Sequence, residues 1–169
     1  MVPRMPDLPA NKFNFISRSP EQTRRLGIHL GAQLHPGDVV CLQGELGAGK
    51  TTFVQGLAVG WGSLDAVSSP TFVLVNVYRR ADNCQFFHFD TYRVESIGEA
   101  EELDIDAMLS SGPLVIEWPE RMSSLLPAER LWIELEYVDE DRREFSFLPV
   151  GKRYVNLVNA FRKSNFGTD

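Results

Sequence analysis

Residues 44–51 read Gly-Glu-Leu-Gly-Ala-Gly-Lys-Thr, and this octapeptide indicates the architecture of the whole chain. Its pattern, a glycine followed by four residues and then Gly-Lys-Thr, is that of a phosphate-binding P-loop. The apolar run Asp38–Gln43 before it suits a buried strand, and apolar residues recur at helical spacing between Lys50 and Gly60. A strand, a glycine-rich loop and a helix in this order are what the motif requires. We therefore predict an α/β fold of the P-loop NTPase type.

The residue types in the octapeptide explain how it would bind phosphate. Glycines have no Cβ, so the main chain can approach phosphate oxygens, and N–H groups at a helix N-terminus attract an anion. We expect Lys50 to reach the β- and γ-phosphates and the Thr51 hydroxyl to take one position on Mg²⁺. The alternative is a turn that binds no ligand, but a plain turn requires neither three glycines nor a Lys-Thr pair at this offset.

Length and charge limit the classes of protein that fit. With 169 residues and a formal net charge of −6, the chain does not suit a broad nucleic-acid-binding surface. We predict one domain over residues 12–169, preceded by a disordered extension at residues 1–11. The first ten residues hold three prolines and no apolar stretch, and no apolar run is long enough to cross a bilayer. We therefore expect a soluble, cytoplasmic protein without a signal peptide or a membrane contact.

Hydrophobic patterns predict the other elements of the domain. We expect strands near residues 13–15, 38–43, 72–78, 85–90, 113–117, 131–137 and 145–147, and helices from Ser19 to about 34, from 50 to about 60, over 99–109 and over about 152–163. Ser19, followed by Pro20 and then Gln22, has the residue types of a helix N-terminus. The fold that these elements predict is a three-layer sandwich with a small mixed parallel and antiparallel sheet, in which hairpins supply the antiparallel strands.

A P-loop alone binds phosphate, whereas hydrolysis or transfer also requires an acid near the metal. Glu117 ends the other short apolar strand, and parallel strands in such folds direct their carboxyl ends toward the ligand crevice. Glu117 is therefore our candidate metal ligand. The alternative is a solvated acid at a strand end with no role in the chemistry.

Residue chemistry leaves the roles of two further residues open. Asp90 leaves an apolar strand, where it could orient a water molecule or form a local ion pair with Arg93. Thr71 could reach the γ-phosphate or the metal, although Ser/Thr-Pro loops are also common turn material. We expect His88 to pack within the hairpin rather than to act in catalysis.

Four motifs occur in one order: Gly-Glu-Leu-Gly-Ala-Gly-Lys-Thr-Thr (44–52), Ser-Pro-Thr-Phe (69–72), His-Phe-Asp-Thr-Tyr-Arg (88–93) and Ile-Glu-Trp-Pro-Glu (116–120). With these motifs the chain closely resembles the TsaE family, formerly YjeE, from about Ser19 to about Phe147. Members of that family are bacterial ATPases of tRNA threonylcarbamoyladenosine biosynthesis. The resemblance therefore implies ATP and Mg²⁺ as ligands.

The same resemblance assigns roles to individual residues. It implies that Thr51 and Glu117 hold Mg²⁺, and that Asp90, Thr71 and Lys50 support hydrolysis. The residues that it implies as ATP contacts are Gly47, Ala48, Gly49, Lys50, Thr51, Thr52, Ser19 and Arg142, with Arg143 as the alternative to Arg142. The turn that holds these two arginines, Asp-Glu-Asp-Arg-Arg, lacks a glycine expected there in relatives.

The resemblance also implies a function. TsaE-like proteins act with TsaB and TsaD, and TsaD transfers the threonylcarbamoyl group to adenosine 37 of tRNAs that read ANN codons. The chain would then be a slowly hydrolysing ATPase subunit that resets this complex and meets tRNA only indirectly. Two alternatives stay open, a P-loop small-molecule kinase and a nucleotide-dependent adaptor that does not hydrolyse ATP. A GTPase is not expected, because the chain contains neither Asn-Lys-x-Asp nor Asp-x-x-Gly.

Overall fold

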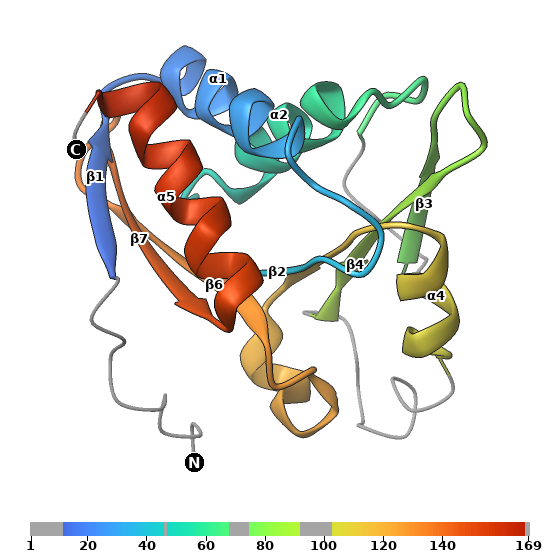
Figure 1. The fold of residues 1–169 in the computed structure, drawn as a ribbon. Coiled ribbons are helices and arrows are strands. Elements are labelled where there is room, and N and C mark those ends of the chain that lie inside the picture. The colour runs from blue at the N-terminus through green and yellow to red at the C-terminus, as the bar shows by residue number, and fades with distance from the viewer. Residues whose placement is uncertain (1–11, 46, 68–74, 92–102, 168–169) are drawn as a thin grey trace.

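The computed structural model describes residues 12–45, 47–67, 75–91 and 103–167, which form a mixed sheet covered by helices (Figure 1). Within these residues the sheet has seven strands in the order β1-β7-β6-β2-β5-β4-β3. The strands are β1 (Phe13–Ser17), β2 (Val39–Gln43), β3 (Val75–Arg79), β4 (Gln85–Asp90), β5 (Leu114–Glu117), β6 (Arg130–Tyr137) and β7 (Arg143–Val150). The extension predicted at residues 1–11 lies outside the described residues.

The centre of the sheet is parallel and its two sides are antiparallel. Strand β2 pairs in parallel with β5 and β6, and β4 pairs in parallel with β5. The hairpins β3–β4 and β6–β7 and the pair β1–β7 are antiparallel. The predicted mixed sheet with hairpin-supplied antiparallel strands is thus confirmed. Because β2, β4 and β5 run the same way, their carboxyl ends meet at one edge of the sheet.

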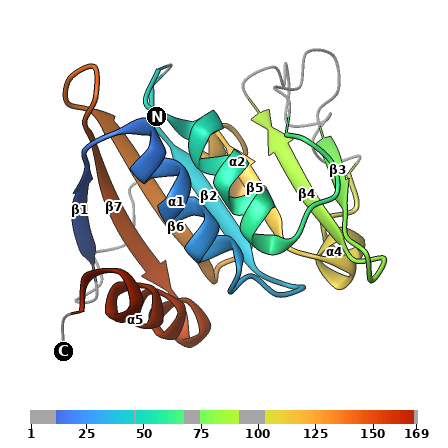
Figure 2. The ribbon, with the colours of Figure 1, turned by 90° about the horizontal axis from the view of Figure 1, so that it is seen from above.

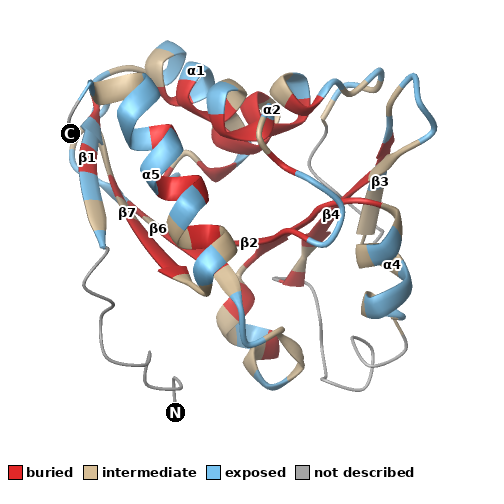
Figure 3. Cartoon of the chain, viewed as in Figure 1, coloured by how far each residue is buried: buried red, intermediate tan, exposed pale blue. Residues whose placement is uncertain are grey.

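Helices cover both faces of the sheet (Figures 1 and 2). The helices are α1 (Pro20–Gly31), α2 (Lys50–Trp61), α4 (Ile105–Ser111), α5 (Lys152–Phe166) and the 3₁₀ helix η2 (Pro119–Leu125). One buried cluster joins α1, α2 and α5 to the sheet, and a second joins α4 and η2 to its other face. The buried residues shown in Figure 3 accordingly lie along the central strands and on the inward sides of α1, α2 and α5. The result is the predicted three-layer sandwich.

The elements differ from their predicted bounds at a few ends. The closing helix continues to Phe166, three residues beyond its predicted end. Of the predicted strand 72–78, the described residues 75–78 lie in β3, which continues to Arg79. Of the predicted helix 99–109, the described residues 103 and 104 precede α4, which begins at Ile105 and continues to Ser111. Every helix in the described ranges is too short or too polar to span a bilayer.

Helix α1 begins where its capping residues predict. The Ser19 hydroxyl accepts a hydrogen bond from the Gln22 N–H at 3.1 Å, and the Gln22 side-chain oxygen accepts one from the Arg18 N–H at 2.7 Å. The first bond is the N-cap of α1, the second ties the residue before the cap to the first turn, and Pro20 occupies that turn.

The backbones of α1 and α2 approach each other closely at glycines. A Cβ atom at Gly56 would lie 2.2 Å from the Arg24 carbonyl oxygen, and one at Gly60 would lie 1.9 Å from the Ile28 carbonyl oxygen. Both contacts pair successive turns in the same order, so the two helices run parallel. The N-terminus of α1 therefore lies at the same end of the sheet as the P-loop, as Figure 2 shows.

Candidate functional site

The P-loop joins β2 to α2 in a conformation that only glycine adopts readily. Gly47 and Gly49 have φ values of +84° and +96°, in the left-handed region that a Cβ atom disfavours. Helix α2 begins at Lys50, and within the described residues no side chain caps its first turn. A helix start leaves main-chain N–H groups without intrahelical partners, so the first turn of α2 can donate to a bound anion.

The Lys50 ammonium is held at this loop by two contacts. Its Nζ donates to the Gly44 carbonyl oxygen at 2.6 Å and lies 3.7 Å from the centre of the Trp118 ring. Lys50 is buried, and burial lowers the pKa of its ammonium, while nearby carboxylates, Glu117 first among them, act in the opposite direction. A phosphate group would therefore find a largely desolvated positive charge already in position.

Two carboxylates lie on neighbouring strand ends beside the P-loop strand. Glu117 ends β5 opposite Leu42 of β2, and it also pairs in register with Asp90 at the end of β4. Glu117 is buried and Asp90 is half-buried. The charges of both act on Lys50, which places them within electrostatic reach of its ammonium. The structure thus brings together Lys50, Glu117 and Asp90, which lie far apart in the sequence.

Glu117 has a buried partner that we did not predict. The Nε2 atom of His88 lies 2.5 Å from a Glu117 carboxylate oxygen, and the Tyr78 hydroxyl lies 3.1 Å from Nδ1 of the same ring. His88 is packed within the β3–β4 hairpin, as expected, but its ring also binds the candidate metal ligand. One sequence pattern could have indicated that His88 faces the site. His88 and Asp90 are two residues apart, and residues with this spacing on a strand lie on one face of it.

Residues present at the site fit a magnesium nucleotide. Thr51 is exposed at the start of α2, so its hydroxyl is accessible, and Glu117 supplies a carboxylate. Among the described residues no group of three or more His, Cys, Asp or Glu side chains could hold a metal by itself. Mg²⁺ usually takes one or two protein ligands together with phosphate oxygens and water, which is the number of ligands that Thr51 and Glu117 could supply.

The arginine that contacts the P-loop is Arg143 rather than Arg142. Its Nε donates to the Gly47 carbonyl oxygen at 3.2 Å, and its guanidinium lies 4.6 Å from the centre of the Tyr137 ring. Arg142 instead pairs with Asp139 at 2.7 Å within the exposed turn. The reason is that β7 begins at Arg143, which leaves Arg142 in the turn. We therefore replace Arg142 by Arg143 as the candidate nucleotide contact.

The other predicted residues are placed as follows. Ala48 is buried, so only its main chain can face a ligand, and Thr52 is half-buried on α2. Ser19 lies at the P-loop end of the molecule, but its hydroxyl caps α1. Thr71 lies outside the described residues.

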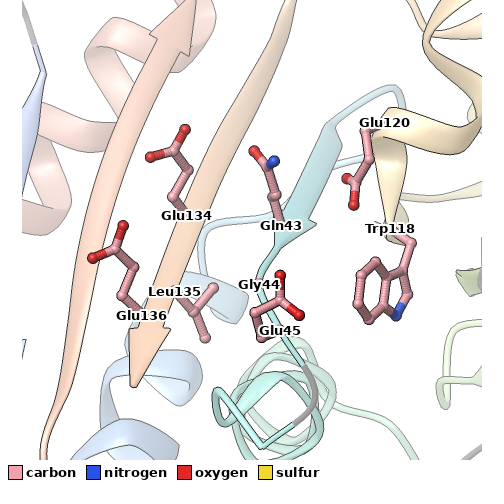
Figure 4. Close-up of a pocket in the computed structure, with 8 residues that line it drawn as sticks. All are labelled: Gln43, Gly44, Glu45, Trp118, Glu120, Glu134, Leu135 and Glu136. Atoms are coloured by element: carbon pink, nitrogen blue, oxygen red, sulfur yellow. The ribbon is translucent and has the colours of Figure 1, made fainter. Parts of the chain in front are cut away.

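A pocket of about 310 Å³ adjoins the P-loop (Figure 4). It is lined by Gln43, Gly44, Glu45, Trp118, Glu120, Glu134, Leu135 and Glu136. Gln43 is oriented by Trp132, whose indole N–H donates to its side-chain oxygen at 2.9 Å. The four acids of the lining would repel phosphate groups, so we do not assign the nucleotide phosphates to this pocket.

Comparisons with known proteins agree on one family. The family model for the threonylcarbamoyl adenosine biosynthesis protein TsaE matches residues 17–145. The tRNA threonylcarbamoyladenosine biosynthesis protein TsaE of Bacillus subtilis is 39% identical over 140 residues, which cover 82% of this chain and 87% of that protein. The protein of the same name from Streptomyces coelicolor is 43% identical over 115 residues, covering 67% and 78% of the two chains.

The fold also resembles a solved structure. The crystal structure of Bacillus subtilis YdiB matches with a TM-score of 0.75 and 31% sequence identity. The match covers 91% of this chain and 96% of that one.

Proposed function

The chain belongs to the TsaE family, and on that premise we propose that it is an ATP-binding, slowly hydrolysing subunit of tRNA threonylcarbamoyladenosine biosynthesis. Its ligands would be ATP and Mg²⁺. One observation carries the proposal. The glycine-rich P-loop, with its buried Lys50, lies at the edge of the sheet where β4 and β5 end. The carboxylates of Asp90 and Glu117 stand at the ends of these two strands. This is the arrangement that P-loop chemistry requires.

Each group has a distinct task in this proposal. Main-chain N–H groups from residues 47–52, together with the Lys50 ammonium, bind and orient the β- and γ-phosphates. Thr51 and Glu117 hold Mg²⁺, which when bound neutralises charge on the phosphate oxygens. Asp90 accepts a hydrogen bond from the attacking water and so orients it toward the γ-phosphate. Arg143 extends the positive charge along the P-loop.

The proposed partners are TsaB and TsaD, with the transfer to adenosine 37 of tRNA carried out by TsaD. A net charge of −6 favours binding to protein partners over direct binding to tRNA, whose phosphates are also negatively charged. Contact with tRNA would then be indirect, and the site of action would be the cytoplasm. We expect slow turnover by the isolated chain and faster turnover with the TsaB–TsaD pair, which would complete the site.

Calorimetry with Mg·ATP and a phosphate-release assay test the proposal. We expect Lys50→Ala to abolish binding, because it removes the ammonium from the loop. We expect Asp90→Ala to keep binding and to lose hydrolysis. Asp106→Ala, which removes an exposed carboxylate of α4 on the other face of the sheet, is the matched control and should behave as wild type.

The outcomes separate the alternatives. Absence of Mg·ATP binding by the wild-type chain would refute the proposal. Function that survives Asp90→Ala but not Lys50→Ala would favour the adaptor, which binds but does not hydrolyse. Transfer of label from ATP to a compound in a metabolite mixture would favour the kinase. Turnover that does not rise with TsaB and TsaD would count against the proposed partners.

A further inference from the structure

A chain of buried polar side chains crosses three adjacent strands and ends on Glu117. The Tyr78 hydroxyl of β3 meets Nδ1 of His88 on β4, and Nε2 of His88 meets Glu117 on β5. Tyr78, His88 and Glu117 are 3%, 1% and 6% exposed. Burying polar groups is unfavourable unless they bond to one another, and apolar side chains such as Phe86 and Val115 surround this position.

The sheet register explains why these side chains meet. Tyr78 pairs with Phe86 and Asn76 pairs with His88 across β3 and β4, while His88 pairs with Val115 across β4 and β5. Residues that are paired, or two apart on one strand, share a face of the sheet. His88 and Glu117 therefore lie diagonally on the same face, which is the face that carries α2 and the P-loop.

The chemistry of the three groups determines the direction of the hydrogen bonds. A carboxylate that binds a cation can only accept, so Nε2 of His88 carries the proton that points to Glu117. In the neutral ring Nδ1 then accepts from the Tyr78 hydroxyl, which holds the ring in this tautomer and orientation. One carboxylate oxygen is bound in this way, while a carboxylate can still bind a cation through its other oxygen.

Resting on the proposed function, we infer that His88, itself oriented by Tyr78, is a positioning residue for Glu117. It holds the carboxylate at the end of β5 in the orientation that binds the Mg²⁺ of the nucleotide. Hydrogen-bond partners of metal ligands have this effect generally, and their loss usually lowers metal affinity about 10- to 100-fold.

Two amide variants of similar polarity test the inference. Gln places its amide near the position of Nε2 and can still donate to Glu117, whereas the shorter Asn places it near Nδ1 and cannot reach. Affinity for ATP is measured by calorimetry in EDTA and at increasing Mg²⁺ for wild type, His88→Gln, His88→Asn and Tyr78→Phe. Thermal unfolding in EDTA confirms that each variant is folded.

We expect His88→Asn to lower the apparent Mg²⁺ affinity about 10- to 100-fold, with ATP binding in EDTA unchanged. His88→Gln should stay within about threefold of wild type, and Tyr78→Phe should fall between the two. Equal Mg²⁺ dependence in His88→Asn and wild type overturns the inference, as does an equal loss in His88→Asn and His88→Gln. If the His88 variants do not fold, an unchanged Mg²⁺ dependence in Tyr78→Phe overturns it. A wild-type chain that binds no Mg·ATP refutes the proposed function instead.

Discussion

Replacing Gly56 by alanine should destabilise the protein, although alanine is the better helix former. Gly56 lies in the middle of α2, and a Cβ atom there would sit 2.2 Å from the Arg24 carbonyl oxygen and 3.0 Å from the Cα atom of Gly27. All of these neighbours are backbone atoms of α1, so no side-chain rotation can relieve the contact. The two helices would have to separate by about 1 Å to restore an ordinary van der Waals distance.

The magnitude follows from two opposing effects. Overpacking of a well-packed interface costs about 1–3 kcal/mol, and the backbone neighbours place this site at the upper end. The higher helix propensity of alanine relative to glycine stabilises the folded protein by about 1 kcal/mol. We therefore expect a net loss of about 2 kcal/mol, which lowers the Tm of a chain of this length by about 4–8 °C.

Differential scanning calorimetry and urea unfolding would measure this loss. Val59→Ala, at an exposed position on the same helix, is the matched control and should leave the Tm unchanged or slightly raised. A Tm for Gly56→Ala at or above that of wild type would contradict this prediction, since helix propensity would then outweigh the backbone contact.

Three further predictions concern other parts of the molecule. Burial raises the pKa of the Cys41 thiol to about 12, so iodoacetamide at pH 8 should label Cys84 alone in the folded protein and both thiols in urea, as read by mass spectrometry; fast native labelling of Cys41 would contradict this. Asp38→Asn removes the charge of a buried carboxylate whose oxygen lies 2.8 Å from a guanidinium nitrogen of Arg153 on α5. The free energy of unfolding should therefore fall by about 2 kcal/mol in urea titrations, and an unchanged midpoint would contradict this. Arg143→Ala should weaken ATP binding about tenfold by calorimetry, while Arg142→Ala should not, and the reverse order would restore Arg142 as the contact.

Local signals in the sequence predicted most of the fold. The P-loop pattern, the Ser19 cap and the alternating hairpin strands each depend on a few consecutive residues, and the structure contains all of them. Glu117 and Asp90 could also be placed at one edge of the sheet, because a parallel arrangement implies that their strands end together.

Features that depend on register or on close packing could not be predicted in this way. The contact between His88 and Glu117 requires the pairing of β4 with β5, which no local pattern encodes. The choice between Arg142 and Arg143 depended on the residue at which β7 begins. The close approach at Gly56 depended on the crossing of two helices, which single-helix periodicity does not contain.

The pairing of β1 with β7 has a consequence for how the molecule is made. Residues 13–17 leave the ribosome early, but their partner strand, 143–150, follows only near the end of synthesis. At ordinary translation rates this delay is on the order of ten seconds. The first strand to be synthesised is therefore among the last to be paired. Until then Phe13 and Phe15 lack the phenylalanine rings of β7 on which they pack in the folded protein.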